Sequence, residues 1–346
     1  MTERLRKIQI DRPGGYDALK TVQAPIRPPG EGEVLVEARA CGVNYADGII
    51  RMGLYASAKE LHGYPITPGF ELSGVVTAIG PGVTQFAVGD AVLALTLFGG
   101  YASHITLPAE RVFRKPANLS FAQAAALPTV FLTAWFMVRE QVQPKAGDAW
   151  LVHSAAGGVG SALCQLGRLH GCRVIGVVGA AHKRADALAM GADDVIDKSA
   201  QDLWREAERL APGGFQAVFD ANGVSTLAQS YAHLAPMGKL CIYGFASMLP
   251  RDGRLNWLRL AWDWLRTPRF NPLDMTQSNK SVLAANLSFL SAHAGLLSAG
   301  MHELLALFEA GRLQPPPVTA YALDDAAKAQ AAIESGKTTG KLVLEP

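Results

Sequence analysis

A glycine-rich segment carries the clearest chemical signal in the sequence. Val152-His-Ser-Ala-Ala-Gly-Gly-Val-Gly160 contains the frame Ala155-x-Gly157-x-x-Gly160, between a strand-like and a helix-like stretch. In that context the pattern binds a dinucleotide: Gly157 lets the backbone approach a pyrophosphate, and Gly160 lets the helix pack closely on its strand. Free N–H groups at the helix start hold the anion. We therefore predict cofactor contacts from Ala155, Ala156, Gly157, Gly158, Val159 and Gly160, rather than a turn used only for packing.

The residues after the next strand indicate which nucleotide binds. An NAD enzyme presents Asp or Glu there for the ribose 2′-hydroxyl. Here the strand over 173–178 runs into Gly179 without an acid, Lys183 and Arg184 follow, and Lys198 comes after the third strand. A cation pairs with the 2′-phosphate of NADPH, which an acid would repel. We predict NADPH, with contacts from Gly179, Lys183 and Lys198; the alternative is that Lys183 and Arg184 only cover a helix start.

The elements around this loop alternate between strands and helices. Six near-continuous apolar strands are predicted over 149–154, 173–178, 194–197, 217–220, 239–243 and 282–290. Between them lie amphipathic helices over 161–170, 183–190, 200–210 and 225–234. This alternation predicts a parallel sheet with helices on both faces.

The first third of the chain has a different pattern. Strands over 33–38, 72–80, 90–95 and 101–107 are separated by Gly/Pro turns, which predicts a mostly antiparallel unit. We expect the first of these strands to break at Cys41-Gly42, and Ser120 to cap a helix over 121–127. A helix over 299–310 and a strand over 339–344 follow the six-stranded sheet. We expect this C-terminal piece to fold back onto the first domain, because the parallel sheet is already full.

Composition excludes several classes of protein. The chain has 346 residues, 49% hydrophobic and 18% charged, which is enough for about two domains and too apolar for disorder. Its net charge is 32 − 30 = +2, so nothing draws it generally to nucleic acid. The four cysteines form no CxxC pair, and the charged start, Met1-Thr-Glu-Arg-Leu-Arg-Lys7, does not resemble a secretory signal. No run of about 18 uninterrupted apolar residues occurs. We expect a cytoplasmic protein.

Motifs along nearly the whole chain resemble one family. They are Gly42-Val-Asn-Tyr-Ala-Asp47, Arg51-Met-Gly-Leu-Tyr55, Pro68-Gly-Phe-Glu71, Gly80-Pro-Gly-Val83, Val88-Gly-Asp90, the glycine loop with Gln165, and Gly340-Lys-Leu-Val-Leu344. Together they are similar to the zinc-free quinone oxidoreductase branch of the medium-chain dehydrogenase/reductase superfamily. The resemblance implies an α/β protein: a GroES-like, mostly β catalytic domain over 1–124 and 293–346, and a six-stranded, doubly wound Rossmann domain for NADPH over 125–292.

Departures from the zinc alcohol dehydrogenases are informative. Those relatives have Cys where this chain has Asn44, His where it has Phe70, and Cys near Thr129, and their four-cysteine zinc lobe is missing here. Phe cannot ligate zinc, and Asn and Thr replace thiolates poorly. We therefore expect no metal, and hydride transfer to a quinone or an α,β-unsaturated carbonyl. Their reduction gives a delocalised anion, so positioning can carry much of the rate.

The resemblance also implies roles for residues outside the glycine loop. Asn44 would lie near the nicotinamide, and Tyr55 would line the pocket, either donating its O–H to the acceptor or serving as an ordinary aromatic rim. Further cofactor contacts would come from Thr129, Asn222, Tyr243, Gly244 and Phe245. Lys341 would reach a phosphate or lie at the surface. We expect Asp47 to orient a turn and His153 to pack in the core.

The segment over 250–275 is unusually rich in Trp and Arg. Leu255, Leu258, Trp262 and Leu265 fall on one helical face, Arg254, Arg259, Arg266 and Arg269 flank it, and Pro268 ends the helix. With Asn279-Lys280, this resembles the subgroup related to vesicle amine transport proteins. We expect the helix to cover the active-site cleft or to pack on a partner subunit, the chain being a homodimer through the sixth strand. The alternative is contact with a membrane surface through 254–269, in a membrane-associated or interaction protein with little catalysis.

Overall fold

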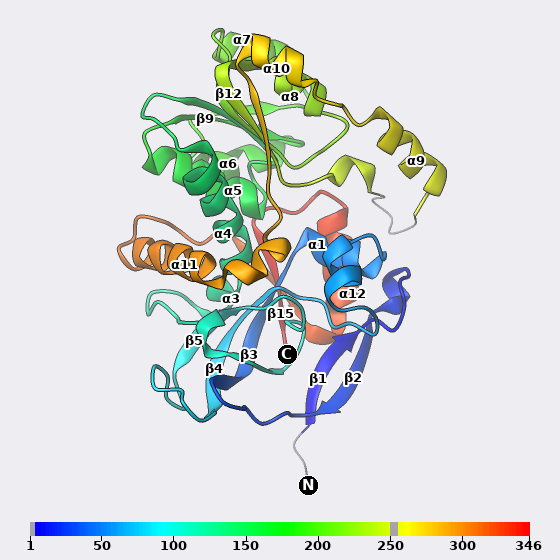
Figure 1. Cartoon of the computed structure of the whole chain (residues 1–346), viewed down its shortest axis with the longest axis vertical. Helices are drawn as coiled ribbons and strands as arrows, with labels where there is room; N and C mark the ends of the chain where they lie inside the picture. The colour runs from blue at the N-terminus through cyan, green and yellow to red at the C-terminus, as the bar shows by residue number, and fades with distance from the viewer. Residues whose placement is uncertain (1–3, 250–254) are drawn as a thin grey trace. The chain divides into compact units, whose positions relative to one another are not determined.

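A computed structural model describes residues 4–249 and 255–346 of the chain. The chain divides into two compact units (Figure 1). Of the described residues, the first unit holds 4–132 and 288–346, and the second holds 133–249 and 255–287. In these described parts, every helix is too short or too polar to cross a membrane.

The first unit is built on a mostly antiparallel sheet of seven strands, as the sequence predicts. Its order is β14-β15-β3-β4-β5-β7, and β6 also pairs with β3. The bounds are β3 Glu33–Val43, β4 Glu71–Ile79, β5 Ala91–Leu95, β6 His104–Pro108, β7 Val112–Arg114, β14 Val318–Ala322 and β15 Lys341–Glu345. β15 pairs with β3 in the register Leu342 to Val43, which brings the C-terminal strand beside the strand that leads to Asn44. A separate hairpin joins β1 (Arg4–Gln9) to β2 (Lys20–Pro25).

The predicted break at Cys41-Gly42 is wrong. β3 continues to Val43, because Cys41, Gly42 and Val43 pair with Leu344, Val343 and Leu342 of β15. Gly42 is needed for a different reason, since a Cβ there would lie 2.4 Å from a Glu71 side-chain oxygen. The glycine marks a close approach inside the strand rather than its end.

Helices of 5 to 16 residues complete the first unit. They are α1 Tyr45–Arg51, α2 Ala56–Leu61, α3 Phe121–Ala125, α11 Ala294–Glu309 and α12 Ala326–Glu334. Ser120 caps α3 as predicted, in a capping box with Gln123. A buried ion pair joins α1 to α12, with the Arg51 guanidinium 2.7 Å from a Glu334 carboxylate oxygen. α4 (Pro128–Phe136) follows α3 along the chain and ends in the second unit.

The second unit contains the predicted parallel sheet. Its strand order, β10-β9-β8-β11-β12-β13, is that of a doubly wound dinucleotide fold. The strands are β8 Ala149–His153, β9 Arg173–Val178, β10 Asp194–Asp197, β11 Phe215–Asp220, β12 Leu234–Ile242 and β13 Ser281–Ala284. Its helices include α5 Gly158–Leu169, α6 Arg184–Ala189, α7 Leu203–Leu210, α8 Leu227–Ala232, α9 Trp257–Arg266 and α10 Pro272–Ser278.

Several predicted boundaries in this unit are wrong. α5 begins at Gly158 rather than at residue 161, because its N-cap is Gly157 of the loop itself. The sixth strand covers only Ser281–Ala284, and Leu287–His293 forms a 3₁₀ helix instead of continuing the strand. α9 ends at Arg266, before Pro268, as predicted. Arg254, at the start of the Trp/Arg segment, lies outside the described residues.

Candidate functional site

The glycine loop between β8 and α5 has the geometry of an anion cradle. Gly157 is the N-cap of α5, and no side chain caps the helix. The first-turn N–H groups therefore remain for a ligand, at the positive end of the helix dipole. At Gly160, a Cβ would lie 2.2 Å from the Ser154 carbonyl oxygen, so only glycine lets α5 approach the loop this closely. Both features fit the pyrophosphate of a dinucleotide.

Two lysines lie close together beyond the ends of β9 and β10. Burial and the neighbouring charge of Lys198 both lower the pKa of Lys183. The Lys198 side chain also passes Gly179, where a Cβ would be 3.7 Å from its Cε. No acid stands at residues 179–183, and Asp197 at the end of β10 accepts hydrogen bonds from Ser199. This arrangement suits a phosphate better than a ribose hydroxyl.

A buried carboxylate organises the loop after β11. Asp220 is fully buried, and its Oδ1 accepts hydrogen bonds from the backbone N–H groups of Asn222 (2.8 Å) and Gly223 (3.1 Å). Its Oδ2 accepts from the hydroxyls of Thr226 (2.7 Å) and Ser230 (2.8 Å). The side-chain amide nitrogen of Asn222 is buried and has no hydrogen-bond partner among the described residues. An amide held this way fits a ligand that supplies an acceptor.

His153 is a packing residue, as predicted. It is fully buried, its Nε2 lies 3.1 Å from the Ser230 hydroxyl, and its ring contacts Trp204 edge to face. Burial lowers the pKa of His153, and the charge of Asp220 only partly opposes this effect. The imidazole is therefore neutral at pH 7 and supports β8 from inside the core. The Tyr243 hydroxyl lies 3.5 Å from the His153 carbonyl oxygen at the end of β8.

A second group of polar residues is buried in the first unit, around Asn44. The Asn44 side-chain N–H donates to Glu71 Oε1 at 2.7 Å, and Lys341 Nζ donates to Asn44 Oδ1 at 2.7 Å. Lys341 Nζ also donates to Glu71 Oε1 (2.7 Å) and to the Val43 carbonyl oxygen (2.8 Å). Glu71 Oε2 accepts the backbone N–H of Thr129 at 2.7 Å. We call Asn44, Glu71 and Lys341 the amide cluster.

Asp47 orients the turn that carries Asn44, as predicted. Its carboxylate accepts the backbone N–H groups of Asn44 (2.8 Å) and Gly69 (2.9 Å) and the hydroxyl of Tyr101 (2.8 Å). Burial raises the pKa of Asp47 to about 6, although these hydrogen bonds and the charge of Lys341 lower it. The group is thus ionised at pH 7 and holds α1 at its first turn.

Tyr55 belongs to an aromatic group near α2. Its ring meets Phe70 edge to face at 5.8 Å between centroids, and Phe70 lies 5.7 Å from Phe98. The Tyr55 hydroxyl is 2.8 Å from the Ser288 hydroxyl oxygen. The hydroxyl has a protein partner, which leaves both predicted roles, a donor to the acceptor and an aromatic rim, compatible with the geometry.

Comparison with known proteins identifies the family. Residues 30–117 match the alcohol dehydrogenase GroES-like domain, and residues 190–344 match the model described as zinc-binding dehydrogenase. The chain is also 34% identical to the human synaptic vesicle membrane protein VAT-1 homolog, over 99% of this chain and 86% of that protein. The chain belongs to the medium-chain dehydrogenase/reductase superfamily. The resemblance seen in the motifs is confirmed.

Two solved structures of superfamily members are similar over the whole chain. A quinone oxidoreductase from Pseudomonas syringae has a TM-score of 0.84 and 33% identity, covering 99% of this chain and all of that one. A quinone oxidoreductase from Escherichia coli, complexed with NADPH, has a TM-score of 0.85 and 29% identity, with 99% and 100% covered. This chain is therefore an oxidoreductase-type member of the superfamily, with a nicotinamide-binding fold.

At the positions where zinc-dependent members of the superfamily have metal ligands, this chain has Asn44, Phe70 and Thr129. The Asn44 amide is bonded to Glu71, Phe70 packs between Tyr55 and Phe98, and Thr129 offers a hydroxyl in place of a thiolate. Within residues 4–249 and 255–346, no group of three or more His, Cys, Asp or Glu residues could hold a metal ion. All four cysteines are buried as free thiols.

The structure changes the interpretation of Lys341 and adds Glu71. Lys341 is only 3% exposed, so the predicted surface position is wrong, and its three N–H donors are all bonded to protein oxygens. Glu71 was not predicted as a site residue, although the motif Pro68-Gly-Phe-Glu71 contains it. An acid that follows an apolar turn and begins a buried strand indicates a carboxylate with a role inside the protein, and the prediction overlooked this signal. The other predicted cofactor contacts stay predictions. They are the loop residues, Asn222, and Tyr243, Gly244 and Phe245 after β12.

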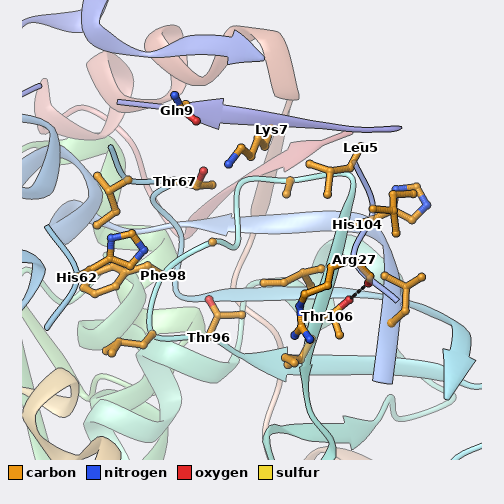
Figure 2. A pocket seen from close by; sticks show the side chains of 18 of the residues that line it. Leu5, Lys7, Gln9, Arg27, His62, Thr67, Thr96, Phe98, His104 and Thr106 are labelled. Atoms are coloured by element: carbon orange, nitrogen blue, oxygen red, sulfur yellow. Dashed lines mark hydrogen bonds between the residues drawn. The ribbon is translucent and has the colours of Figure 1, made fainter. Parts of the chain in front are cut away.

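A cavity of about 500 Å³ lies elsewhere in the first unit (Figure 2). Lys7, Arg27, His62, His104 and Arg111 contribute to its lining, and no Asp or Glu does. Figure 2 shows His62 and Phe98 together at one end and Arg27 near Thr106 at the other, joined by a hydrogen bond from the Thr106 hydroxyl to the Arg27 carbonyl oxygen. Neither the amide cluster nor Tyr55 lines this cavity, although Phe98, which contacts Phe70, does.

Proposed function

We propose that this chain is a cytoplasmic, NADPH-dependent reductase that transfers hydride to a quinone or an α,β-unsaturated carbonyl without zinc. The observation that carries the proposal is the amide cluster. At a position where zinc-dependent relatives have a thiolate, this chain holds a buried amide between a carboxylate and an ammonium. An oriented N–H stabilises the negative charge that develops on the acceptor oxygen. Because that charge is delocalised in a reduced quinone or enone, the reaction can proceed without a Lewis acid.

The second unit supports the cofactor part of the proposal. The first turn of α5 would hold the pyrophosphate, Lys183 and Lys198 would pair with the 2′-phosphate, and the unpartnered amide of Asn222 would bond the ribose side. When bound, NADPH supplies the hydride. The chain's own contribution is to orient the acceptor, to donate the Asn44 N–H to its oxygen, and to keep water from the reacting carbon. Two of the solved structures that are similar to this chain are described as complexes with NADPH.

The direct test of this function combines binding with turnover. NADPH should bind with a rise in nicotinamide fluorescence, and the protein should oxidise it in the presence of at least one member of a panel of quinones and enones. NADH measured in parallel reports the preference for the 2′-phosphate. Absence of NADPH binding at high micromolar concentration would reject the proposal, and so would binding without turnover on the whole panel.

Removing the two lysines should reverse the nucleotide preference. We expect Lys183→Ala and Lys198→Ala each to weaken NADPH binding at least about tenfold, since a charge-assisted hydrogen bond contributes roughly 1.5–3 kcal/mol. NADH binding should change by less than about twofold, because NADH lacks the phosphate that these cations contact. Fluorescence titration with both nucleotides measures the effect. Arg209→Ala is the control, since Arg209 is an exposed cation paired with Glu206 on α7. Equal losses for both nucleotides would contradict the assignment.

A second candidate function rests on α9. Its apolar residues face solvent: Trp257, Leu258, Trp262, Trp264 and Leu265 are each at least 61% exposed. The one buried residue of the helix is Asp263. Among the described residues of this chain nothing covers the apolar face, so packing on a partner subunit stays a prediction. Exposed Trp beside Arg259 and Arg266 suits the interface of an anionic membrane, so we propose membrane association through α9 as the alternative function.

Vesicle binding tests the alternative. We expect the protein to sediment with phosphatidylcholine vesicles that contain phosphatidylserine, and Trp262→Ala with Trp264→Ala to lower the bound fraction several-fold, because two large apolar contacts are lost. Met237→Ala is the control, as Met237 is an exposed apolar side chain (74%) on β12 rather than on α9. Sedimentation that is unchanged by the double substitution would exclude α9 as the membrane contact.

The sheet edge supports the predicted homodimer. β13 is the last strand of the six, and it pairs only with β12 in the described structure. Edge strands with free N–H and C=O groups are templates for pairing with another chain. We propose that two copies associate through β13.

A further inference from the structure

We propose that Glu71 and Lys341 are positioning residues that fix the Asn44 amide in a single orientation, with one N–H directed to the acceptor oxygen. The inference rests on the proposed reductase function and deepens it. It assigns a role to Glu71, and it replaces the predicted phosphate contact of Lys341.

The hydrogen bonds leave the amide one orientation. Asn44 Nδ2 faces the Glu71 carboxylate, and Asn44 Oδ1 faces the Lys341 ammonium, each at 2.7 Å. Rotating the amide by half a turn would place its NH₂ against the ammonium and its oxygen against the carboxylate. Two charge-assisted hydrogen bonds would become two repulsive contacts. The network therefore assigns the oxygen and nitrogen of Asn44 without ambiguity.

The charged partners cannot turn away from the amide. The third N–H of the Lys341 ammonium donates to the Val43 carbonyl oxygen. The second carboxylate oxygen of Glu71 accepts the backbone N–H of Thr129. Asn44, Glu71 and Lys341 are 7%, 0% and 3% exposed, so water offers these groups little competition. Their pairing in a low dielectric is strong, and breaking it leaves an uncompensated buried charge.

The sheet itself holds the three residues at one place. Lys341 begins β15 and Glu71 begins β4, and both strands pair with β3, whose last residue precedes Asn44. The register sets Val343 opposite Gly42 and Leu72 opposite Cys41. Gly42 admits the Glu71 side chain, because any Cβ there would overlap it. The end of β3 and the starts of β4 and β15 thus hold the Asn44 amide in a fixed position.

One hydrogen of the amide is left for a ligand. Asn44 Nδ2 carries two hydrogens, and in the described part of the chain a single acceptor, Glu71 Oε1, is found for them. The second N–H is the donor that the acceptor oxygen would use. Glu71 and Lys341 touch neither hydride nor acceptor in this scheme, so their effect on catalysis must pass through Asn44.

A mutant cycle tests this dependence. We expect Lys341→Met to lower kcat about tenfold or more, since losing one preorganised donor costs at least that much, while KM for NADPH changes less than about twofold. In an Asn44→Ala background, the same substitution should change kcat less than about twofold, because the group it positions is gone. Lys341→Arg should restore most of the rate. Lys20→Met, which removes an exposed lysine paired with Asp11, is the control for loss of a charge.

A spectroscopic measurement keeps the test independent of turnover. The side-chain amide resonances of Asn44, identified by their loss in Asn44→Ala, should move in Lys341→Met and return in Lys341→Arg. If Lys341→Met fails to fold, Glu71→Gln serves instead, because it removes the charge and keeps the side-chain shape. A wild-type protein that reduces no quinone or enone would reject the proposed function, while the resonances would still decide the positioning. Unmoved resonances, or equal losses of kcat in both backgrounds, would overturn the inference.

Discussion

Substitution of Gly160 by valine is expected to abolish dinucleotide binding. A Cβ at this position would lie 2.2 Å from the Ser154 carbonyl oxygen and 2.8 Å from the Ala155 Cα. Both neighbours are backbone atoms, so no side chain can move aside, and α5 must shift away from the loop. The same N–H groups that would hold the pyrophosphate sit on that first turn. We expect more than a hundredfold loss of NADPH affinity, about 3 kcal/mol, in fluorescence titration.

A graded series of glycine substitutions separates this effect from a general loss of stability. Gly157→Ala places its Cβ 3.2 Å from the Ser154 carbonyl oxygen, a tight contact that a small shift relieves. Gly213→Ala, in the same unit, meets nothing within 4 Å and serves as the control. The affinity for NADPH should fall in the order Gly213→Ala, Gly157→Ala, Gly160→Val. A Gly160→Val protein that binds NADPH normally would show that the first turn of α5 is not the cofactor site.

Local sequence signals predicted the second unit well. The glycine frame, the apolar strands and the amphipathic helices each act over a few residues, and the strand order is that of the doubly wound fold they indicate. The boundary of α5 was missed because Gly157 both belongs to the loop and caps the helix. Such a double role has no separate signature in the sequence.

Contacts across long sequence distances could not be predicted in the same way. Lys341 and Glu71 are 270 positions apart, and only the pairing of β15 and β4 with β3 joins them. A lysine after Gly340 gives no sign of whether it ends in solvent or in the core. The same limit applies to Cys41-Gly42, which was interpreted as a strand end because its pairing with the distant strand β15 leaves no local signal.

The Trp/Arg segment shows a further limit of periodicity. A 3.6-residue period places Leu258, Trp262 and Leu265 on one face, and it correctly predicts a helix that ends before Pro268. Periodicity does not say which face turns inward. Asp263 is the one buried residue of α9, whereas its ion-pair partner Arg259, 3.7 Å away, is exposed like the Trp and Leu side chains.

Asp220→Ala is the second substitution with a large expected effect, this time on folding stability. The carboxylate accepts two backbone N–H groups and two hydroxyls in a fully buried site. Alanine leaves these donors without an acceptor, and each unsatisfied buried group costs roughly 1–3 kcal/mol. The hydroxyls can turn to other partners, whereas the N–H groups of Asn222 and Gly223 cannot. We expect the free energy of unfolding to fall by about 3–5 kcal/mol in urea titration.

Asp220→Asn distinguishes the hydrogen bonds from the charge. Its oxygen can still accept the two N–H groups, and its NH₂ can donate to Thr226 and Ser230, because a hydroxyl donates or accepts as required. Ser230 could then donate to His153 Nε2, which matches the neutral imidazole of this core. We expect a loss of only about 1 kcal/mol. Asp202→Ala, which removes an exposed cap that accepts two N–H groups of α7, should also cost about 1 kcal/mol. If Asp220→Ala cost no more than Asp202→Ala, burial would not set the strength of this network, and the loop that carries Asn222 would have to be held by other contacts.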